Sequence, residues 1–209
     1  ETTIRPRLAS TNRYNPRAKR LLATIFLRES RRMPATPALD SLRETLPDEL
    51  KDLRLNLSSI FGGEHLSAEQ SLGVALAAAR FDRCPKLAEA FEADLQAACA
   101  DSAAAVISDA VAAAGLMGMN TVYYRFRHMV GKESYGSRPA RLRMTRIAQP
   151  ATDKATFELM SLGCAAMAGC EACIQNHESS LVNLGVSEDA CHDAVRIAAV
   201  VRGAITGLC

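Results

Sequence analysis

Hydrophobic residues recur at spacings of three and four along most of this 209-residue chain, which is the period of an amphipathic α-helix. The clearest run consists of Leu42, Leu46, Leu50, Leu53 and Leu57. It predicts a helix over residues 40–57, which Pro47 divides into two pieces because proline cannot donate the backbone hydrogen bond of a helix interior. Pro34 and Pro37 stand ahead of this helix and indicate a short linker.

Capping residues mark the starts of the next helices. Ser67 and Gln70 have the spacing of a capping box, in which each side chain bonds to the backbone of the other residue. Pro85 and the pair Asp101-Ser102 stand just before two further apolar-periodic segments. The predicted helices run from 67 to about 80, from 86 to about 98, and from 101 through the apolar residues that end at Met119.

The C-terminal third of the chain contains three more helical segments. Glycine and proline predict a loop over residues 131–139. Helices are expected over about 153–168, 170–184 and 188–208. Gly169 and Gly185 end the first two, and Ser187 caps the last. Since no segment alternates as a β-strand would, the sequence predicts an all-α fold.

Two short matches indicate an internal repeat of two helical halves. Residues 71–75 match residues 161–165 ninety positions later, and residues 109–111 match residues 193–195 eighty-four positions later. In the register of the first match, Arg80 and Arg83 take the positions of Cys170 and Cys173. Only the second half would then carry thiol chemistry.

The composition is that of an ordinary soluble globular protein. Hydrophobic residues make up 48% of the chain and charged residues 23%, and the length allows one well-cored domain or two small ones. Aromatic residues make up only 5% and alanine is abundant, which favours close-packed helices. No run of 18 uninterrupted apolar residues is present, so no membrane-spanning helix is predicted and no membrane is expected as a partner.

The net charge of +2 hides an asymmetry between a basic leader and a mildly acidic body. Residues 1–32 hold nine basic and two acidic side chains, and the remainder holds 16 basic and 21 acidic ones. The body shows no basic face interleaved with aromatic residues, so no nucleic-acid partner is expected. The leader is interpreted as an extension outside a domain of residues 33–209 that starts naturally at Met33; a transit peptide and an export signal are the alternatives.

Only two of the seven cysteines, Cys170 and Cys173, are spaced like a motif. The other five are Cys84, Cys99, Cys164, Cys191 and Cys209, and each lies in an apolar helical context. There a free thiol packs as a small hydrophobic group, so these five are predicted to be structural. The pattern indicates a reducing, cytoplasmic compartment and one active dithiol.

Cys170, Cys173 and His177 fall three and four residues apart and therefore share one face of a helix. The positive end of that helix lowers the pKa of a thiol in its first turn. One thiolate could then attack a peroxide or a disulfide, and the other would close an intramolecular disulfide. Spacing alone does not place Glu158 near these groups, but a carboxylate beside His177 would complete a proton relay.

The rival interpretation of this stretch is a zinc-binding or redox-sensing Cys-x-x-Cys module without turnover. Cys170, Cys173 and His177 supply three ligands, and Cys191 or His192 could supply a fourth. The distance along the chain from His177 to His192 does not match the usual finger spacings. The remaining histidines, His65 and His128, are expected at the surface, as is His192, and the basic segment 125–132 is either a solvated helix face or a docking patch for an acidic partner.

Several segments match one known family in order. They are residues 55–60, 117–120, 142–144, 157–159, Gly169-Cys170, Cys173 and His177-Glu178. On these residues the chain from about Leu39 to Cys209 resembles the alkyl hydroperoxide reductase D (AhpD) family of the carboxymuconolactone-decarboxylase-like superfamily.

The resemblance implies an all-helical antioxidant enzyme, often a homotrimer, that uses neither a metal nor an organic cofactor. It further implies that Cys173 is the attacking thiolate, that Cys170 pairs with it and takes part in proton transfer, and that His177 and Glu158 form the relay that activates the thiol. Family members reduce organic hydroperoxides weakly by themselves, re-reduce the peroxiredoxin AhpC, and receive electrons from a dihydrolipoamide-bearing protein.

The chain departs from the family pattern at two positions. Ala172 stands where the best-known members have a histidine just before the second cysteine. Met160 stands where the family has a tryptophan, which is interpreted as a change in packing. The four positions of the expected relay are present, so activity is expected to survive.

Overall fold

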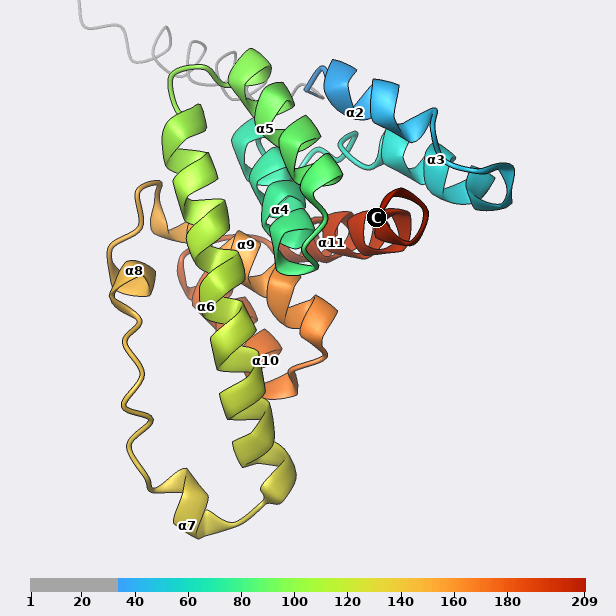
Figure 1. The fold of residues 1–209 in the computed structure, drawn as a ribbon. Coiled ribbons are helices and arrows are strands. Elements are labelled where there is room, and N and C mark those ends of the chain that lie inside the picture. The colour runs from blue at the N-terminus through green and yellow to red at the C-terminus, as the bar shows by residue number, and fades with distance from the viewer. Residues whose placement is uncertain (1–33) are drawn as a thin grey trace, which may run out of the picture. The chain divides into compact units, whose positions relative to one another are not determined.

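The computed structural model describes residues 34–209, and within them every regular element is a helix (Figure 1). The expectations for the leader of residues 1–32 therefore lie outside the described residues. The elements are α2 (Pro37–Arg43), η1 (Asp48–Leu50), α3 (Lys51–Ser59), α4 (Ala68–Phe81), α5 (Pro85–Ala98), α6 (Ala103–Val130), α7 (Glu133–Gly136), α8 (Thr145–Ala148), α9 (Lys154–Ala168), α10 (Glu171–Asn183) and α11 (Glu188–Leu208). The predicted all-α class is confirmed.

Helices α4 and α9 form the centre of the core. They pack against each other, and both also pack against α6 and α11. Gly73 of α4 lies against Met160 of α9, and Gly163 of α9 lies against Val74 of α4. The two helices can approach closely at these points because each glycine has no side chain. Met160 is fully buried at this crossing, in agreement with its interpretation as a packing residue.

The predicted helix starts are largely correct because they depend on local hydrogen bonds. Ser67 and Gln70 form the capping box, with Ser67 Oγ accepting from the Gln70 N–H at 3.2 Å. Ser187 accepts from the Ala190 N–H in the same way. Gly185 has φ +83°, the left-handed conformation that glycine adopts without strain after a helix end.

Three sequence-based boundaries are wrong. Pro37 is the first residue of α2 and not part of a linker, which suits proline because the first helical N–H has no partner within the helix. Helix α6 continues eleven residues beyond Met119, since no breaker intervenes before Gly131 at φ +63°. The predicted loop after α6 contains α7, and α8 follows it without having been predicted.

Helix α6 is long and apolar enough, by length and composition alone, to cross a membrane. The same properties occur in core helices of soluble proteins, and Val106, Ala110, Ala113 and Met117 of α6 are buried in the core. The sequence-based expectation did not include this helix, because polar residues interrupt its apolar run.

The helix starts change the register in which the two halves are compared. Helices α4, α5 and α6 follow one another in the first half as α9, α10 and α11 do in the second. Cys84 is the N-cap of α5 and Cys170 is the N-cap of α10, 86 positions later. Cys84, and not Arg80, therefore stands at the position equivalent to Cys170, while the repeat itself stays a prediction.

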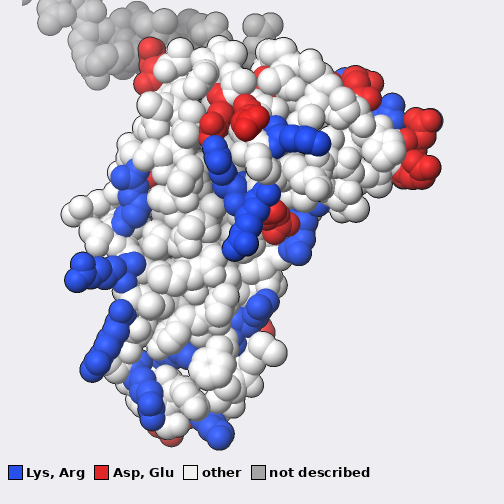
Figure 2. All heavy atoms as spheres, viewed as in Figure 1, with Lys and Arg blue, Asp and Glu red and all other residues white. Residues whose placement is uncertain are grey.

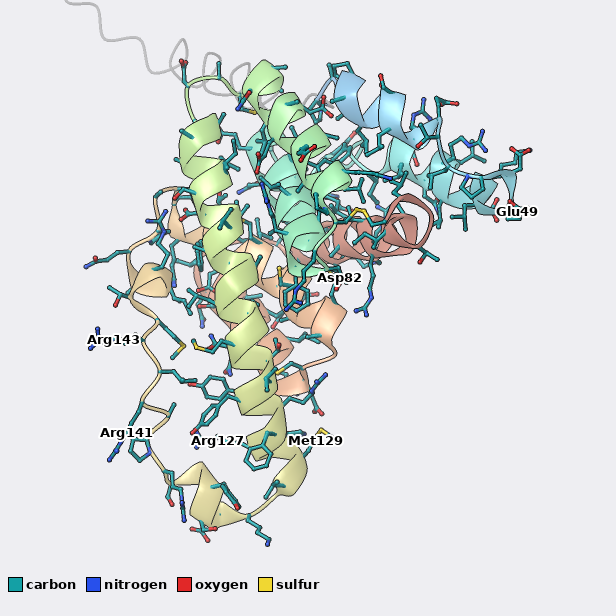
Figure 3. The ribbon with its side chains drawn as sticks, in the orientation of Figure 1. Glu49, Asp82, Arg127, Met129, Arg141 and Arg143 are labelled. Carbon is teal, nitrogen blue, oxygen red and sulfur yellow. A yellow bond between two sulfur atoms is a disulfide. The ribbon has the colours of Figure 1, made fainter. Side chains whose placement is uncertain are left out.

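Charges are unevenly distributed over the face seen in Figure 2. Lys and Arg gather over the C-terminal end of α6 and the segment that carries α7 and α8, whereas Asp and Glu gather near α5 and the turn between α2 and α3. Arg127 lies on α6, and Arg141 and Arg143 project from the connection between α7 and α8 (Figure 3).

Candidate active site

The start of α10 presents the dithiol. Helix α9 ends at Gly169, whose φ of +64° turns the chain, and the Cys170 N–H then bonds back to the carbonyl of Ala165 at 3.2 Å. Cys170 becomes the N-cap of α10 and Cys173 its third residue. Cys173 therefore lies in the turn whose free N–H groups give a helix its positive end, as predicted.

The structure joins the two sulfurs as a Cys170–Cys173 disulfide. Cys170 is completely buried, whereas 6% of Cys173 is exposed. The pair packs with Ala165 and is flanked by Tyr124 and Ile174. Cys173 lines the cavity between α6 and α10 and Cys170 does not, so a small molecule in that cavity would contact Cys173.

Glu158 and His177 are brought together from α9 and α10. His177 Nδ1 lies 2.5 Å from Glu158 Oε2, so that Nδ1 donates and Nε2 is left to accept or release a proton. Lys154, one helical turn before Glu158, donates from Nζ to the other carboxylate oxygen at 2.7 Å. The contact between Glu158 and His177 could not be derived from spacing, because it joins residues nineteen positions apart.

The carboxylate of Glu158 is buried but remains ionised. Burial opposes its ionisation, yet the hydrogen bonds and positive charges of His177 and Lys154 outweigh this cost and lower its pKa below the ordinary value of 4.5. The hydrogen bond from Nδ1 to this carboxylate also fixes the orientation of the His177 ring. The arrangement is that of a base held and oriented by a fixed carboxylate.

A cavity of about 190 Å³ opens beside these groups. It is lined by Asn120, Tyr124, Cys173, Asn176 and His177. The candidate nucleophile and the candidate base thus face one space between α6 and α10. A reagent placed there would contact both, which is what thiol chemistry with proton transfer requires.

Arginines from two other helices hold the turn that precedes the dithiol. Arg125 of α6 donates from Nη1 to the carbonyl of Ala168 at 2.6 Å, and Arg202 of α11 donates to the carbonyl of Met167. These carbonyls belong to the last turn of α9, where a helix has no partner of its own for them. The turn is therefore fixed from both sides.

Sequence reasoning did not assign Lys154, Asn120, Tyr124 or Asn176 to the site. Lys154 could have been found, because it stands four positions before Glu158 and such pairs meet on a helix. Asn120 and Tyr124 also share a helix face at that spacing, but nothing local indicates that this face meets α10. Their place follows only from the packing of α6.

The prediction of five packed free thiols is wrong for two of them, Cys84 and Cys209. They form a second disulfide, which joins the start of α5 to the end of the described chain, 125 positions later in the sequence. Sequence alone could not pair them, because only the tertiary fold brings these ends together. The indication of a single dithiol in a reducing compartment rested on this assumption and loses that support.

The other cysteines are free, as predicted. Cys164 and Cys191 are buried, and Cys99 is partly exposed. Burial raises the pKa of all three thiols, so they remain protonated near neutral pH. None of the three lines the cavity beside Cys173.

The remaining predicted site residues stay apart. Within residues 34–209, no three His, Cys, Asp or Glu side chains are arranged to hold a metal ion, and both motif cysteines are occupied by their disulfide. His65 and His192 are exposed. His128 is exposed too, with Nε2 3.3 Å from Glu171 at the start of α10.

The chain is similar to known proteins over most of its length. The Carboxymuconolactone decarboxylase family matches residues 134–206, which include α9, α10 and most of α11. A protein from Anaeromyxobacter sp. (strain Fw109-5), described as "Alkyl hydroperoxide reductase AhpD", is 52% identical over 170 residues, covering 81% of this chain and 90% of the relative. This chain belongs to the AhpD family.

Other AhpD relatives come from different bacteria. A protein of the same description from Rhodopseudomonas palustris (strain BisB18) is 46% identical over 79% of this chain and 90% of its own length. One from Methylobacterium sp. (strain 4-46) is 44% identical over 81% of this chain and 95% of its own length. The resemblance inferred from the sequence is confirmed, and with it membership of the alkyl hydroperoxide reductase enzymes within the carboxymuconolactone-decarboxylase-like superfamily.

Proposed function

We propose that this AhpD family member is a dithiol enzyme that reduces organic hydroperoxides and the disulfide of an AhpC-type peroxiredoxin. The observation that carries the proposal is the cavity that Cys173 and His177 both line. Cys170 is bonded to Cys173, and Glu158 is hydrogen-bonded to His177. The names of the AhpD relatives support the same class of activity.

In the first step the thiolate of Cys173 attacks the terminal oxygen of a hydroperoxide. An S–O bond forms, the O–O bond breaks, and Cys173 becomes a sulfenic acid. The departing alkoxide needs a proton, which His177 supplies from Nε2 while Glu158 holds Nδ1. The products are an alcohol and the oxidised cysteine.

In the second step Cys170 attacks the sulfur of the sulfenic acid. The disulfide forms and the hydroxyl group leaves as water, with the thiol proton of Cys170 passing to it. The Cys170–Cys173 disulfide of the structure is the product of this step. The sum of both steps converts one hydroperoxide and two thiols into an alcohol, water and one disulfide.

An external dithiol returns the enzyme to its reduced form. A dihydrolipoamide-bearing protein supplies two electrons and two protons by attacking the sulfur of Cys173, which lines the cavity, and the reduced pair then passes them to a hydroperoxide or to oxidised AhpC. The basic surface formed by Arg127 of α6 and by Arg141 and Arg143 of the α7–α8 connection is a suitable docking surface for an acidic electron-donor protein. This cycle operates in the cytoplasm and needs no metal or organic cofactor in the enzyme.

The enzyme acts as a homotrimer that associates through the outer face of α6. That face carries, at spacings of three and four, Val111, Gly115, Gly118, Val122, Phe126 and Met129. The four large side chains are exposed, and nothing within residues 34–209 comes within 4 Å of a Cβ placed on either glycine. Such a stripe lets a second copy approach closely and bury apolar area.

The decisive experiment measures turnover of an alkyl hydroperoxide with dihydrolipoamide as the only donor. We expect Cys173→Ser to reduce turnover to the rate without enzyme, since a hydroxyl cannot replace the thiolate. Cys164→Ser is the matched control, because it removes a buried thiol that does not line the cavity, and it should keep full turnover. Full turnover in Cys173→Ser would refute the proposal.

The trimer is tested separately by light scattering coupled to size-exclusion chromatography. Val122→Glu should convert a trimer into monomers, because it places a charge in the apolar stripe. Val182→Glu on α10 introduces the same charge at another exposed valine and should leave the assembly intact. A wild-type protein that is already monomeric would contradict the proposal.

A further inference from the structure

Asn120 is the one polar side chain of the cavity that is both buried and unsatisfied. It belongs to α6 and is 5% exposed, yet its Oδ1 has no hydrogen-bond partner within residues 34–209. A buried carbonyl oxygen without a partner costs free energy, so such groups are normally bonded to something. The amide lines the same cavity as Cys173 and His177. A ligand bound in that cavity would lie beside Asn120 and could supply a donor to this oxygen.

A hydroperoxide has the group that Asn120 Oδ1 needs. Its terminal oxygen carries the only O–H of the molecule, and this is also the oxygen that a thiolate attacks. When the O–O bond breaks, the terminal oxygen keeps its hydrogen and becomes the hydroxyl of the sulfenic acid. An acceptor placed beside Cys173 can therefore hold this hydrogen before and after the oxygen is transferred.

We propose that the cavity between α6 and α10 is the hydroperoxide-binding site, in which Asn120 Oδ1 accepts the terminal O–H and aims that oxygen at Cys173. This inference rests on the proposed function and adds to it the group that recognises the substrate. His177 meets the other oxygen of the peroxide and protonates it as it leaves. Tyr124, which packs against the dithiol, forms an aromatic wall for the organic group.

The size of the cavity sets the class of substrate. Its volume of about 190 Å³ is below the ~300–1,000 Å³ of pockets that enclose drug-sized ligands. Compact alkyl hydroperoxides fit such a space, whereas a long acyl chain would have to remain outside it. The enzyme is expected to prefer tert-butyl hydroperoxide to a fatty-acid hydroperoxide.

The recognition of an O–H group suggests a sharp experiment. The full chain, reduced beforehand, is mixed separately with tert-butyl hydroperoxide, lipoamide disulfide and iodoacetamide, and the rate of Cys173 modification is measured for each. Only the hydroperoxide carries an O–H for Asn120 to hold. Asn120→Leu keeps the approximate side-chain volume and removes the acceptor. Asn183→Leu makes the same change at an exposed position of α10 away from the cavity.

In Asn120→Leu we expect the hydroperoxide rate to fall about tenfold to a hundredfold, which is the effect of losing one hydrogen bond to a reacting group. The rates with lipoamide disulfide and iodoacetamide should stay at the wild-type values, and Asn183→Leu should match wild type with all three reagents. A structural disturbance would slow all three reactions together, so the selective loss identifies substrate binding.

Other results would overturn the inference. An unchanged hydroperoxide rate in Asn120→Leu would show that the amide does not hold the peroxide. An equal loss with all three reagents would assign Asn120 to the folding or the reactivity of the thiol. If circular dichroism shows that Asn120→Leu is unfolded, Asn120→Ala, which also lacks an acceptor, is measured instead and must show the same selective loss.

The proposed function can fail independently of Asn120. Wild-type protein that reacts with lipoamide disulfide but not with tert-butyl hydroperoxide would refute peroxide reduction itself, and the inference with it. If wild type reacts with tert-butyl hydroperoxide and Asn120→Leu reacts at the same rate, only the inference about Asn120 is refuted.

Discussion

The starts of α5 and α10 have the same backbone but different chemistry. Arg83 and Gly169 both adopt a left-handed turn, at φ +58° and +64°. Each is followed by an N-cap cysteine, Cys84 or Cys170, with ψ of 94° and 93°. The N–H of each cysteine bonds back to the preceding helix, at 2.9 Å and 3.2 Å respectively.

What differs is the set of side chains around the two cysteines. The position three residues after the N-cap is Leu87 in α5 and Cys173 in α10, and the position seven residues after it is Phe91 in α5 and His177 in α10. Leu87 and Phe91 are fully buried. Cys84 therefore lacks a nearby thiol and a base, and it bonds instead to the distant Cys209.

This difference shows that the helix start alone does not make an active thiol. The same turn holds a structural cross-link in one half and the proposed redox pair in the other. Reactivity requires a second thiol within one turn, a base on the same face and a space for the reagent.

The largest difference in turnover is expected between two variants in which one N-cap cysteine is replaced by serine. Cys170→Ser should abolish steady-state turnover with dihydrolipoamide, because Cys173 can still be oxidised but cannot close its disulfide. Cys84→Ser should keep wild-type turnover, since no thiol or base of the proposed relay is altered. Turnover lost equally in both variants would contradict the functional contrast between the two helix starts.

For stability the order is reversed: loss of the Cys84–Cys209 disulfide should lower Tm more than loss of the Cys170–Cys173 disulfide. Cys84→Ser opens a 125-residue cross-link, which in the chain-entropy view is worth about 4–5 kcal/mol, or roughly 10–15 °C in Tm for a chain of this size. Cys170→Ser opens a loop of only a few residues and should change Tm much less. Calorimetry without reductant measures both, and adding reductant should remove the difference between wild type and Cys84→Ser.

Removing the negative charge of Glu158, which accepts the hydrogen bond from His177, should weaken catalysis without abolishing it. Glu158→Gln keeps the shape but not the charged acceptor for His177, so turnover should fall about a hundredfold, within the range of general acid–base contributions. Leu72 of α4 stands 86 positions before Glu158, as Cys84 stands before Cys170, and it is fully buried and apolar. Unchanged turnover in Glu158→Gln would remove the relay from the mechanism.

The pH dependence of stability offers a second measurement on Glu158. Because its pKa is lowered in the folded protein, its ionised form stabilises the fold above the ordinary value of 4.5, and this contribution is lost as the pH falls through the lowered pKa. Wild type should therefore be more stable than Glu158→Gln at neutral pH. The gap between their Tm values should close in acid; a constant gap would disagree with this origin.

The smallest effects are expected at the turn residues. Gly169→Ala should destabilise the protein by about 1 kcal/mol, because a Cβ disfavours the left-handed conformation although nothing lies within 4 Å of it. Arg83→Gly relieves the same strain in the first half and should stabilise by about 0.5 kcal/mol, the gain being reduced by the greater freedom of unfolded glycine. Denaturant unfolding of both variants measures the signs, and equal signs would contradict equivalent turns.

Local signals in the sequence account for most of the helices. The capping box at Ser67, the cap at Ser187 and the glycine turns at Gly169 and Gly185 all operate within a few residues. Errors arose where local signals are weak. The end of α6 has mixed polar and apolar residues, and only the absence of a breaker before Gly131 carries the helix onward.

The sequence by itself determined the helical class, the family resemblance and the position of Cys170, Cys173 and His177 on the first turns of one helix. These follow from short-range periodicity, capping and motif spacing. The same rules could assign no partner to Cys84, since a buried thiol and half of a distant disulfide have the same local pattern.

Only the tertiary structure decided which distant groups meet. It brought Glu158 to His177 across two helices, joined Cys84 to Cys209, and placed Asn120 of α6 beside Cys173 of α10. Each contact depends on how helices cross, and crossings are set by the packing of many side chains at once rather than by any local run of residues. Local spacing therefore predicts the dithiol. The contact between Glu158 and His177, the cavity and the Cys84–Cys209 disulfide depend on how the helices pack.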